Sequence, residues 1–417
     1  MPDRDKLPVI VGYDAASPMG TDLDSQWRAM LAGESGVREL TRFPLKDGFP
    51  VRVAGEVPDL DRCEYPFLSA RKMAHWKSPV FPYSLLVVER ALSRAGIRIT
   101  RDMSPRVATT FSSGIGGLDV VFDAHEKRVL EGRMPRPFVN TNSCINMVAG
   151  KISIHTRARG PISATVSACA TGSTSMIMGA MLLALGKADL AICGAVDFPV
   201  MEIVVAGFAS MNGAYRHRKK EPEPPERASR PFSLGRRGFV VSEGAGCVLL
   251  ATREFARAHG LDWEIELAGW ASNSDAHHYV LPHQDTVGRC MAEAIEDAGI
   301  RPRDVEAVNA HAASTPRGDA VEARALRDVF GRGIPPLVAN KSQFGHAMGA
   351  SSAVESIYAM HGMSRGVLLP TVNYLPDPEL GELPLSGEAV SLEQEHVLKN
   401  AFGFGGCNAC LVFRRVR

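Results

Sequence analysis

The sequence lacks long apolar segments and carries almost no net charge. No stretch reaches the roughly 18 consecutive apolar residues that a membrane-spanning helix needs, so we expect no membrane span. The first residues, MPDRDKLPVIVGYDAASPMG, contain neither the apolar core nor the cleavage site of a signal peptide. The formal net charge of +1 gives no overall field that would attract nucleic acid. We therefore expect a cytoplasmic protein that does not bind nucleic acid.

Cysteines are few and scattered, with eight in 417 residues. This spacing does not match the disulfide framework of a small secreted domain, so we expect reduced thiols. Cys407 and Cys410 have C-x-x-C spacing, but the second cysteine pair or paired histidine of a typical zinc site is missing. We predict no metal site and no permanently bound cofactor.

The length of the chain and its alternating patterns predict a layered α/β protein with two domains. A chain of 417 residues exceeds one ordinary core, and short β-branched runs alternate with helical stretches. Strands are expected at Leu7–Gly12, Arg106–Thr110, Ile162–Ser167, Leu190–Cys193, Gly246–Leu250, Val305–Asn309 and Ala409–Phe413.

Two echoes within the sequence indicate a duplication. Residues 91–97 read ALSRAGI and residues 294–300 read AIEDAGI, each at the end of a helical stretch and before a strand. Gly172 and Gly349 each begin a helix rich in small residues. We therefore predict two similar halves. These halves are residues 1–255 and 256–417.

Cys169 is the first candidate for chemistry. It follows the β-branched run ISATVS and precedes the small-residue helix, which places the thiol at a strand-to-helix turn. The N-terminal end of a helix favours an anion, so a thiolate would be stabilised there. The following helix, Met176 to Leu185, is apolar nearly all round and is expected to be buried. The alternative is a small buried cysteine without a catalytic role.

Two histidines could complete a site around such a thiol. His311 ends a predicted strand, and His346 lies in a glycine-bounded loop before a helix. Strand ends and the loops beyond them are where α/β folds build sites. Lys341 and Glu355 flank His346 and could fix its position, or they could form a surface ion pair of little energetic weight.

Residues 401–408, AFGFGGCN, combine three glycines with two phenylalanines. Glycine permits close approach of backbone to a ligand, and an exposed backbone N–H there could serve an oxyanion hole. The alternative is a tight turn that enters the last strand.

Together these motifs resemble the β-ketoacyl-acyl-carrier-protein synthases, the elongating condensing enzymes of fatty-acid and type II polyketide synthesis. The resemblance runs from VIVGYDAASPMG to FGFGGCNACLVF and includes SSGIGG, NMVAGKISI, RPFSLGRRGFVVSEGAG and ASNSDAHH. It implies the thiolase fold, in which two duplicated αβαβα halves form a five-layered core. It also implies substrates carried on the phosphopantetheine arm of an acyl carrier protein.

The resemblance implies a role for each candidate. Cys169 would carry the acyl chain, and His311 and His346 would stabilise the enolate left when malonyl carrier protein loses CO2. Lys341 and Glu355 would order the second histidine. The oxyanion hole and gating loop would comprise Cys169, Phe404, Gly405 and Gly406. The acyl pocket would be lined by Ile115, Phe208, Val204 and Ala168. The carrier protein would dock on Arg71, Lys72, Arg216 and Arg218.

Several positions depart from the family pattern. Ala313 and Val280 stand where two threonines usually hydrogen-bond the pantetheine arm, Ala312 replaces a glycine, and Cys407 replaces a threonine. The loss of two neutral hydrogen bonds, worth about 0.5–1.5 kcal/mol each, would alter recognition of the arm. These departures favour a specialised fatty-acid or polyketide pathway.

Other functions on the same fold stay open at this point. A non-catalytic subunit resembling a chain-length factor would pair with an active ketosynthase, but such subunits usually lack the cysteine. A thiolase-type acyl-CoA enzyme would use a second cysteine, and Cys407 or Cys410 could supply it. A decarboxylase without condensation typically has glutamine in place of Cys169. The resemblance also implies a homodimer or a heterodimer with a ketosynthase-like partner.

Overall fold

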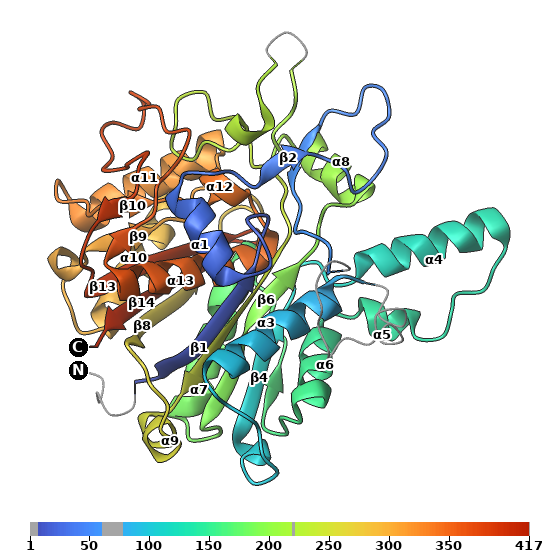
Figure 1. The fold of residues 1–417 in the computed structure, drawn as a ribbon. Helices are drawn as coiled ribbons and strands as arrows, with labels where there is room; N and C mark the ends of the chain where they lie inside the picture. The colour runs from blue at the N-terminus through green and yellow to red at the C-terminus, as the bar shows by residue number, and fades with distance from the viewer. Residues whose placement is uncertain (1–6, 61–77, 219–221, 417) are drawn as a thin grey trace.

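The structure is a computed structural model that describes residues 7–60, 78–218 and 222–416 (Figure 1). Its central feature is a ten-stranded mixed sheet in the order β10-β9-β13-β14-β8-β1-β7-β6-β4-β5. The strands of the first half are β1 (Val9–Ala16), β4 (Val107–Ser112), β5 (Ile162–Ser163), β6 (Leu190–Asp197) and β7 (Gly244–Ala251). Those of the second half are β8 (Ile265–Ser274), β9 (Ala307–Asn309), β10 (Leu337–Val338), β13 (His396–Gly403) and β14 (Cys407–Arg415).

The two halves of the sheet have the same topology. Read outward from the centre, the first half runs β1-β7-β6-β4-β5 and the second runs β8-β14-β13-β9-β10. In each half the first two pairings are antiparallel and the last two are parallel. The halves meet where β1 pairs with β8 over two residues, Val9 with Glu266 and Ile10 with Ile265. The predicted duplication is therefore visible in strand order and direction.

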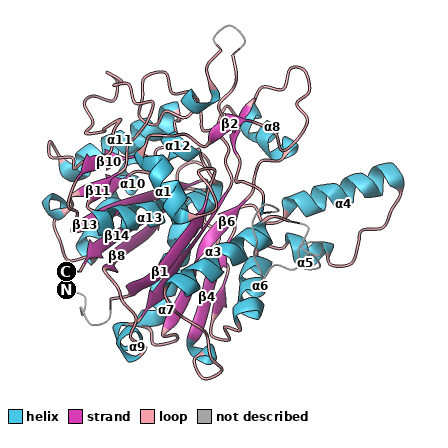
Figure 2. Ribbon diagram, viewed as in Figure 1, coloured by secondary structure: helices cyan, strands magenta, loops and turns pink. Residues whose placement is uncertain are grey.

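Helices pack on the sheet and complete the layers (Figure 2). Apolar side chains of α3 and α6 pack on the outer face of the first half, and those of α10 and α11 pack on the outer face of the second. Helices α7 and α13 lie between the two halves and contribute to the central core. The bounds are α3 (Val80–Arg94), α6 (Asn146–Thr156), α7 (Thr171–Ala184), α10 (Gln284–Asp297), α11 (Pro316–Phe330) and α13 (Met348–Arg365).

The repeated sequence motifs occupy equivalent places in the two halves. The ALSRAGI and AIEDAGI segments end α3 and α10, while Gly172 and Gly349 lie in the first turns of α7 and α13. Helices α7 and α13 pack closely, because a Cβ at Gly172 would lie 2.4 Å from the backbone nitrogen of Ala353. The small residues at the start of each helix thus permit the contact that joins the halves.

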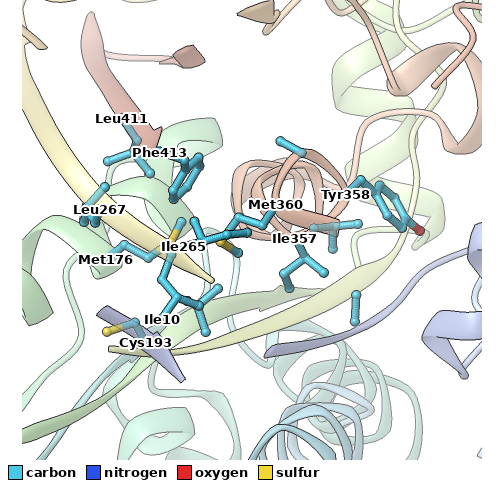
Figure 3. Close-up of a cluster of buried hydrophobic side chains, with 14 of the residues drawn as sticks. Ile10, Met176, Cys193, Ile265, Leu267, Ile357, Tyr358, Met360, Leu411 and Phe413 are labelled. Carbon is cyan, nitrogen blue, oxygen red and sulfur yellow. The ribbon is translucent and has the colours of Figure 1, made fainter. Parts of the chain in front are cut away.

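The central core is closed around α13, which is buried along nearly its whole length. Figure 3 shows Ile357 and Met360 of this helix facing side chains from strands of both halves, among them Ile10 and Leu411. A helix that is buried on all sides takes most of its stability from the elements that surround it. This packing fixes the position of the N-terminal end of α13, where the candidate site lies.

Two expectations need correction. The predicted strand Ile162–Ser167 is only the two-residue edge strand β5, because the chain leaves the sheet before it reaches Cys169. The helix after Cys169 is not buried all round: Met181 is 44% exposed and Leu185, just after the helix, is 67% exposed. The other predicted strands are present with shifted ends.

The remaining elements surround these layers. Helices α4 and α5 project from the body of the protein (Figure 1), and residue 255, where the halves were predicted to divide, lies in α9 between β7 and β8. That boundary stays a prediction. Across the described ranges, we find no helix with the length and apolarity that crossing a membrane requires. The remaining bounds are α1 (Leu23–Leu31), β2 (Val37–Glu39), β3 (Val53–Gly55), α4 (Leu118–Glu131), α5 (Val139–Ser143), α8 (Glu202–Ser210), α9 (Arg253–Ala258), α12 (Lys341–Phe344), β11 (Val367–Leu368) and β12 (Val390–Ser391).

Candidate active site

Cys169 lies at the turn that leads into α7, within a short 3-10 helix formed by Ala168–Ala170. Ala168 has a φ of 47°, a left-handed conformation that a non-glycine residue rarely adopts. The side chain of Cys169 is 7% exposed. Burial raises the pKa of its thiol to about 11, while the charge of Lys341 and the N–H groups of Phe404 and Cys169 oppose that shift. The resting group is therefore a thiol surrounded by groups that favour the thiolate.

His346 contacts the sulfur directly. Its Nε2 lies 3.2 Å from Sγ of Cys169, and its Nδ1 lies 2.9 Å from Oγ of Ser351. The backbone N–H of Ala347 donates to the same Ser351 oxygen at 2.8 Å, which anchors the imidazole to the first turn of α13. Burial, followed by the charges of Lys341 and Lys399, holds the pKa of His346 well below its usual value. The ring is therefore neutral at physiological pH.

His311 follows β9, and its ring centroid lies 5.6 Å from that of His346 at an interplanar angle of 83°. Its backbone N–H and that of Ala312 donate to the two carboxylate oxygens of Glu322, at 2.8 and 2.7 Å. Burial and the charge of Lys341 hold the pKa of His311 well below its usual value. Two neutral imidazoles thus lie side by side next to a thiol.

The Lys341–Glu355 pair is buried beneath these residues. The Lys341 ammonium donates to Oε1 of Glu355 at 2.6 Å and to the carbonyl oxygen of His311 at 2.5 Å. Both side chains are 1% exposed. The alternative of a surface ion pair is therefore wrong. The pair fixes the backbone of His311 as well as the loop that carries His346.

The hairpin between β13 and β14 closes over the thiol. A Cβ at Gly403 would lie 2.4 Å from the carbonyl oxygen of Ser167 and 3.1 Å from the backbone nitrogen of Cys169, so only glycine permits this approach. The N–H of Phe404 is directed at the sulfur. The N–H of Gly405 instead donates to the carbonyl oxygen of Tyr279 at 2.8 Å. Gly405 therefore belongs to the turn and is not an oxyanion donor in this conformation.

Gly406 also serves the turn. Its φ is 72°, and its carbonyl oxygen accepts a hydrogen bond from the backbone N–H of Asp275. The N–H donors around the sulfur are therefore those of Cys169 and Phe404, the pair that we expected.

Aromatic rings link the hairpin to His346. The ring centroids of Phe404 and Phe208 are 6.4 Å apart, those of Phe208 and Phe239 are 5.3 Å apart, and those of Phe239 and His346 are 5.4 Å apart. Ile115 and Phe208 both pack against one buried apolar cluster, which also contains Ala313. Val204 on α8 and Ala168 are half-buried. The expected acyl-pocket residues Ile115 and Phe208 thus lie in one apolar region.

Of the four residues expected to dock the carrier protein, two lie within the described ranges. Arg71 and Lys72 lie outside the described residues. Arg216 and Arg218 are both exposed, and Arg216 donates to the side chain of Asn212 at 3.1 Å. The contacts do not bring these two arginines to the thiol.

Three buried groups near the site were missed by sequence reasoning. Asp197, at the end of β6, accepts hydrogen bonds from the backbone N–H groups of Gly114, Ile115 and Gly349, and so ties the SSGIGG loop to α13. Burial raises its pKa to about 6. Glu322 and Lys399 are the other two. A charged residue inside an otherwise apolar stretch is the available signal for Asp197 and Lys399, since such residues are rarely buried unpaired. Glu322 lies in the charged helix α11 and carries no such signal.

A thiol at a helix N-terminus, two backbone N–H donors and two neutral histidines lie together within a duplicated αβαβα core, an arrangement suited to acyl transfer. The sequence matches the family models of the N-terminal domain of β-ketoacyl synthases over residues 8–256 and of their C-terminal domain over residues 265–375. The chain belongs to the β-ketoacyl synthase family. The predicted class, an acyltransferase that forms carbon–carbon bonds, is confirmed.

Curated relatives agree over the full length. The chain is 33% identical to a 3-oxoacyl-[acyl-carrier-protein] synthase 2 of Staphylococcus aureus, over 99% of both chains. It is 35% identical to the protein of that name from Coxiella burnetii, over 98% of both chains.

Solved structures support the same fold. A structure described as a type II PKS acyl-carrier protein in complex with its ketosynthase bound to the hexaketide matches with a TM-score of 0.89 and 26% identity, over 99% of both chains. The ishigamide ketosynthase/chain length factor matches with a TM-score of 0.87 and 28% identity, over 99% of both chains. The predicted thiolase fold is therefore confirmed.

Proposed function

We propose that Cys169 carries an acyl chain as a thioester and that the chain is extended by decarboxylative condensation with malonyl carrier protein. The observation that carries this proposal is the contact of 3.2 Å between Nε2 of His346 and Sγ of Cys169, in a site that also holds His311. A purely structural cysteine requires neither a neighbouring imidazole nor backbone N–H groups directed at its sulfur.

In the first half-reaction, Cys169 attacks the thioester of an acyl carrier protein. The carbon–sulfur bond to Cys169 forms, the bond to the pantetheine sulfur breaks, and the thiol proton leaves with the pantetheine thiol. The oxygen of Ser351 accepts the backbone N–H of Ala347, so the Ser351 hydroxyl can donate its proton to Nδ1 of His346. The proton of neutral His346 then lies on Nε2, where it donates to the sulfur and stabilises the attacking thiolate.

In the second half-reaction, malonyl carrier protein loses CO2 and the electron pair remains as an enolate. Neutral imidazoles of His311 and His346 donate N–H groups to the enolate oxygen, and their fixed positions make this stabilisation preorganised. The carbanion attacks the acyl carbonyl on Cys169, and the N–H groups of Cys169 and Phe404 bind the resulting oxyanion. Collapse of this intermediate releases the Cys169 thiolate and the β-ketoacyl product.

The substrate arm is a phosphopantetheine thioester of an acidic acyl carrier protein, and its contacts are altered. Ala313 is 8% exposed within an apolar cluster, and Val280 donates only its backbone N–H, to Nδ1 of His278. These apolar side chains support a specialised fatty-acid or polyketide pathway. Basic residues Arg71, Lys72, Arg216 and Arg218 are the proposed docking positions for the acidic carrier.

A dimer fits the exposed edge of the sheet. Edge strand β5 carries Ile162, which is 55% exposed, and Val166, four residues later, is 45% exposed. Apolar side chains along an unpaired strand edge are typical of a subunit interface. We propose that a second ketosynthase chain, identical or related, pairs along β5.

Reconstitution tests the proposed reaction. The purified protein is incubated with an acyl carrier protein and malonyl carrier protein, and both CO2 and the β-ketoacyl product are measured. We expect equal amounts of the two. Cleavage of acetoacetyl-CoA by free coenzyme A without any malonate would instead favour the thiolase-type activity. Condensation only after addition of a second ketosynthase, and unaffected by Cys169→Ala, would favour the non-catalytic subunit.

A further inference from the structure

Lys399 is a buried ammonium that the proposed reaction has not yet used. It lies in β13 between Val397 and Ala401, whose side chains enter the central core, and it is 0% exposed. A lysine in such a place is stable only with close partners. Its Nζ donates to Oε2 of Glu355 at 2.8 Å and to the carbonyl oxygen of Asn400 at 2.5 Å.

Glu355 thereby receives one ammonium on each carboxylate oxygen. Lys341 donates to Oε1 at 2.6 Å and Lys399 to Oε2 at 2.8 Å. Lys341 alone would neutralise the carboxylate, so Lys399 adds a positive charge that this pair does not need. The hydrogen bond from Lys341 to the His311 carbonyl oxygen connects the cluster to the active site.

The surrounding charges show where that extra charge acts. Glu322, on α11, accepts the backbone N–H groups of His311 and Ala312 and the side-chain amide of Asn400. Lys399 faces this second carboxylate as well as Glu355. Burial and the charge of Lys341 lower the pKa of Lys399, while Glu355 and Glu322 oppose that effect. When Lys399 is charged, the positive charges of Lys341 and Lys399 balance the negative charges of the two glutamates. Without the charge of Lys399, the cluster would have a net negative charge next to the histidines.

A negative cluster would act against the chemistry in two ways. It would repel the enolate, which places negative charge between the imidazoles. It would also favour protonation of His311 and His346, whose pKa values are held down by burial and then by Lys341 and Lys399. The other groups that face these rings are the thiol of Cys169, which contacts His346, and Asp197, which acts on that thiol.

We propose that Lys399 is a positioning residue for the decarboxylation half-reaction. Its ammonium holds Glu355 from the side opposite Lys341 and keeps the charge beside the two imidazoles from becoming negative. This role rests on the proposed function, because it concerns the enolate that the two histidines bind. Acylation of Cys169 depends less on this charge, because the groups that act directly on the thiol are His346, Lys341, Asp197 and two backbone N–H groups.

Two variants separate charge from hydrogen bonding. Lys399→Gln keeps an N–H donor for Glu355 without the charge, and Lys399→Met removes both. Glu355 keeps Lys341 in either variant, and Glu322 keeps its hydrogen bonds from His311, Ala312 and Asn400. Thermal unfolding first establishes that each variant is folded. If Lys399→Met does not fold, Lys399→Gln still supports the test.

The measurements are CO2 release from malonyl carrier protein across pH 5–9 and the rate at which an acyl carrier protein acylates Cys169, followed by intact mass. We expect the rate of CO2 release to fall about tenfold or more in both variants. The acid limb of the pH profile should shift to higher pH by on the order of one unit, because removal of a positive charge raises the pKa values of the histidines. Acylation should stay within about twofold of the unchanged protein.

Equal losses in both half-reactions, or an unchanged pH profile in folded variants, would overturn the proposal and leave Lys399 a structural residue. Failure of the proposed function itself looks different. In that case the unchanged protein releases no CO2 from malonyl carrier protein, whatever residue occupies position 399.

Discussion

Nε2 of His346 lies 3.2 Å from Sγ of Cys169, although the two residues are 177 positions apart in the sequence. They meet because each precedes one of the two equivalent helices, α7 and α13, that pack together between the halves of the sheet. The duplicated fold therefore brings the candidate nucleophile of one half to the histidines of the other.

Replacement of His346 by alanine should abolish most decarboxylation. The variant loses one of two preorganised donors to the enolate oxygen, for which a decrease of about 10²–10³-fold in turnover is expected. CO2 release from malonyl carrier protein measures this effect. His259→Ala is the matched control, since His259 stacks on Phe255 in α9 at a ring-centroid distance of 4.1 Å. Equal losses in both variants would contradict the assigned role.

The reactivity of Cys169 should keep rising through alkaline pH. Because burial raises the thiol pKa to about 11, the reactive thiolate is a small fraction at pH 7 and increases about tenfold per pH unit until the pKa is approached. Alkylation by iodoacetamide, followed by intact mass at pH 7, 8 and 9, measures this slope. A rate that is already constant between pH 7 and 9 would show that the histidine and N–H groups outweigh burial.

Glu355→Leu should strongly destabilise the protein. It leaves the ammonium groups of Lys341 and Lys399 buried without their shared carboxylate, which costs about 3–5 kcal/mol of unfolding free energy. Urea unfolding measures the loss. Glu393→Gln is the control, because Glu393 is 85% exposed in its ion pair with Arg415 and should leave the unfolding midpoint nearly unchanged. A midpoint for Glu355→Leu close to that of the control would refute the prediction.

Val280→Thr should improve recognition of a standard pantetheine arm. The added hydroxyl restores one neutral hydrogen bond of about 0.5–1.5 kcal/mol, so the KM for the carrier-bound substrate should fall about two- to tenfold while kcat stays constant. Steady-state condensation kinetics measure KM and kcat separately. Val280→Ala is the matched control, because it adds no hydroxyl. An unchanged or higher KM for Val280→Thr would indicate that the arm does not pass this side chain.

Much of this architecture could be predicted, because local patterns determine it. The turn before α7 follows from the small-residue helix that begins just after Cys169, although the β-branched run before it forms a strand only over Ile162–Ser163. The duplication follows from repeated helix ends. The resemblance supplied the partners of that cysteine, since spacing alone does not show which distant histidine reaches the sulfur.

Other features depend on tertiary contacts that the sequence does not display. The N–H of Gly405 has the flexible setting expected of an oxyanion donor, yet the carbonyl oxygen of Tyr279 engages it. Lys399 is one charged residue in an apolar strand, and its partner Glu355 is 44 positions earlier. The exposed apolar surface of Leu185 also follows from where its helix ends relative to the surface, which periodicity does not indicate.

The central claim is that Cys169 carries the acyl chain, and intact mass spectrometry after incubation with a panel of acyl carrier proteins tests it most directly. The account predicts that at least one acyl group adds its full mass to the protein and that Cys169→Ala gains none under the same conditions. A protein that no carrier acylates, or a Cys169→Ala variant that gains the same mass, would contradict it.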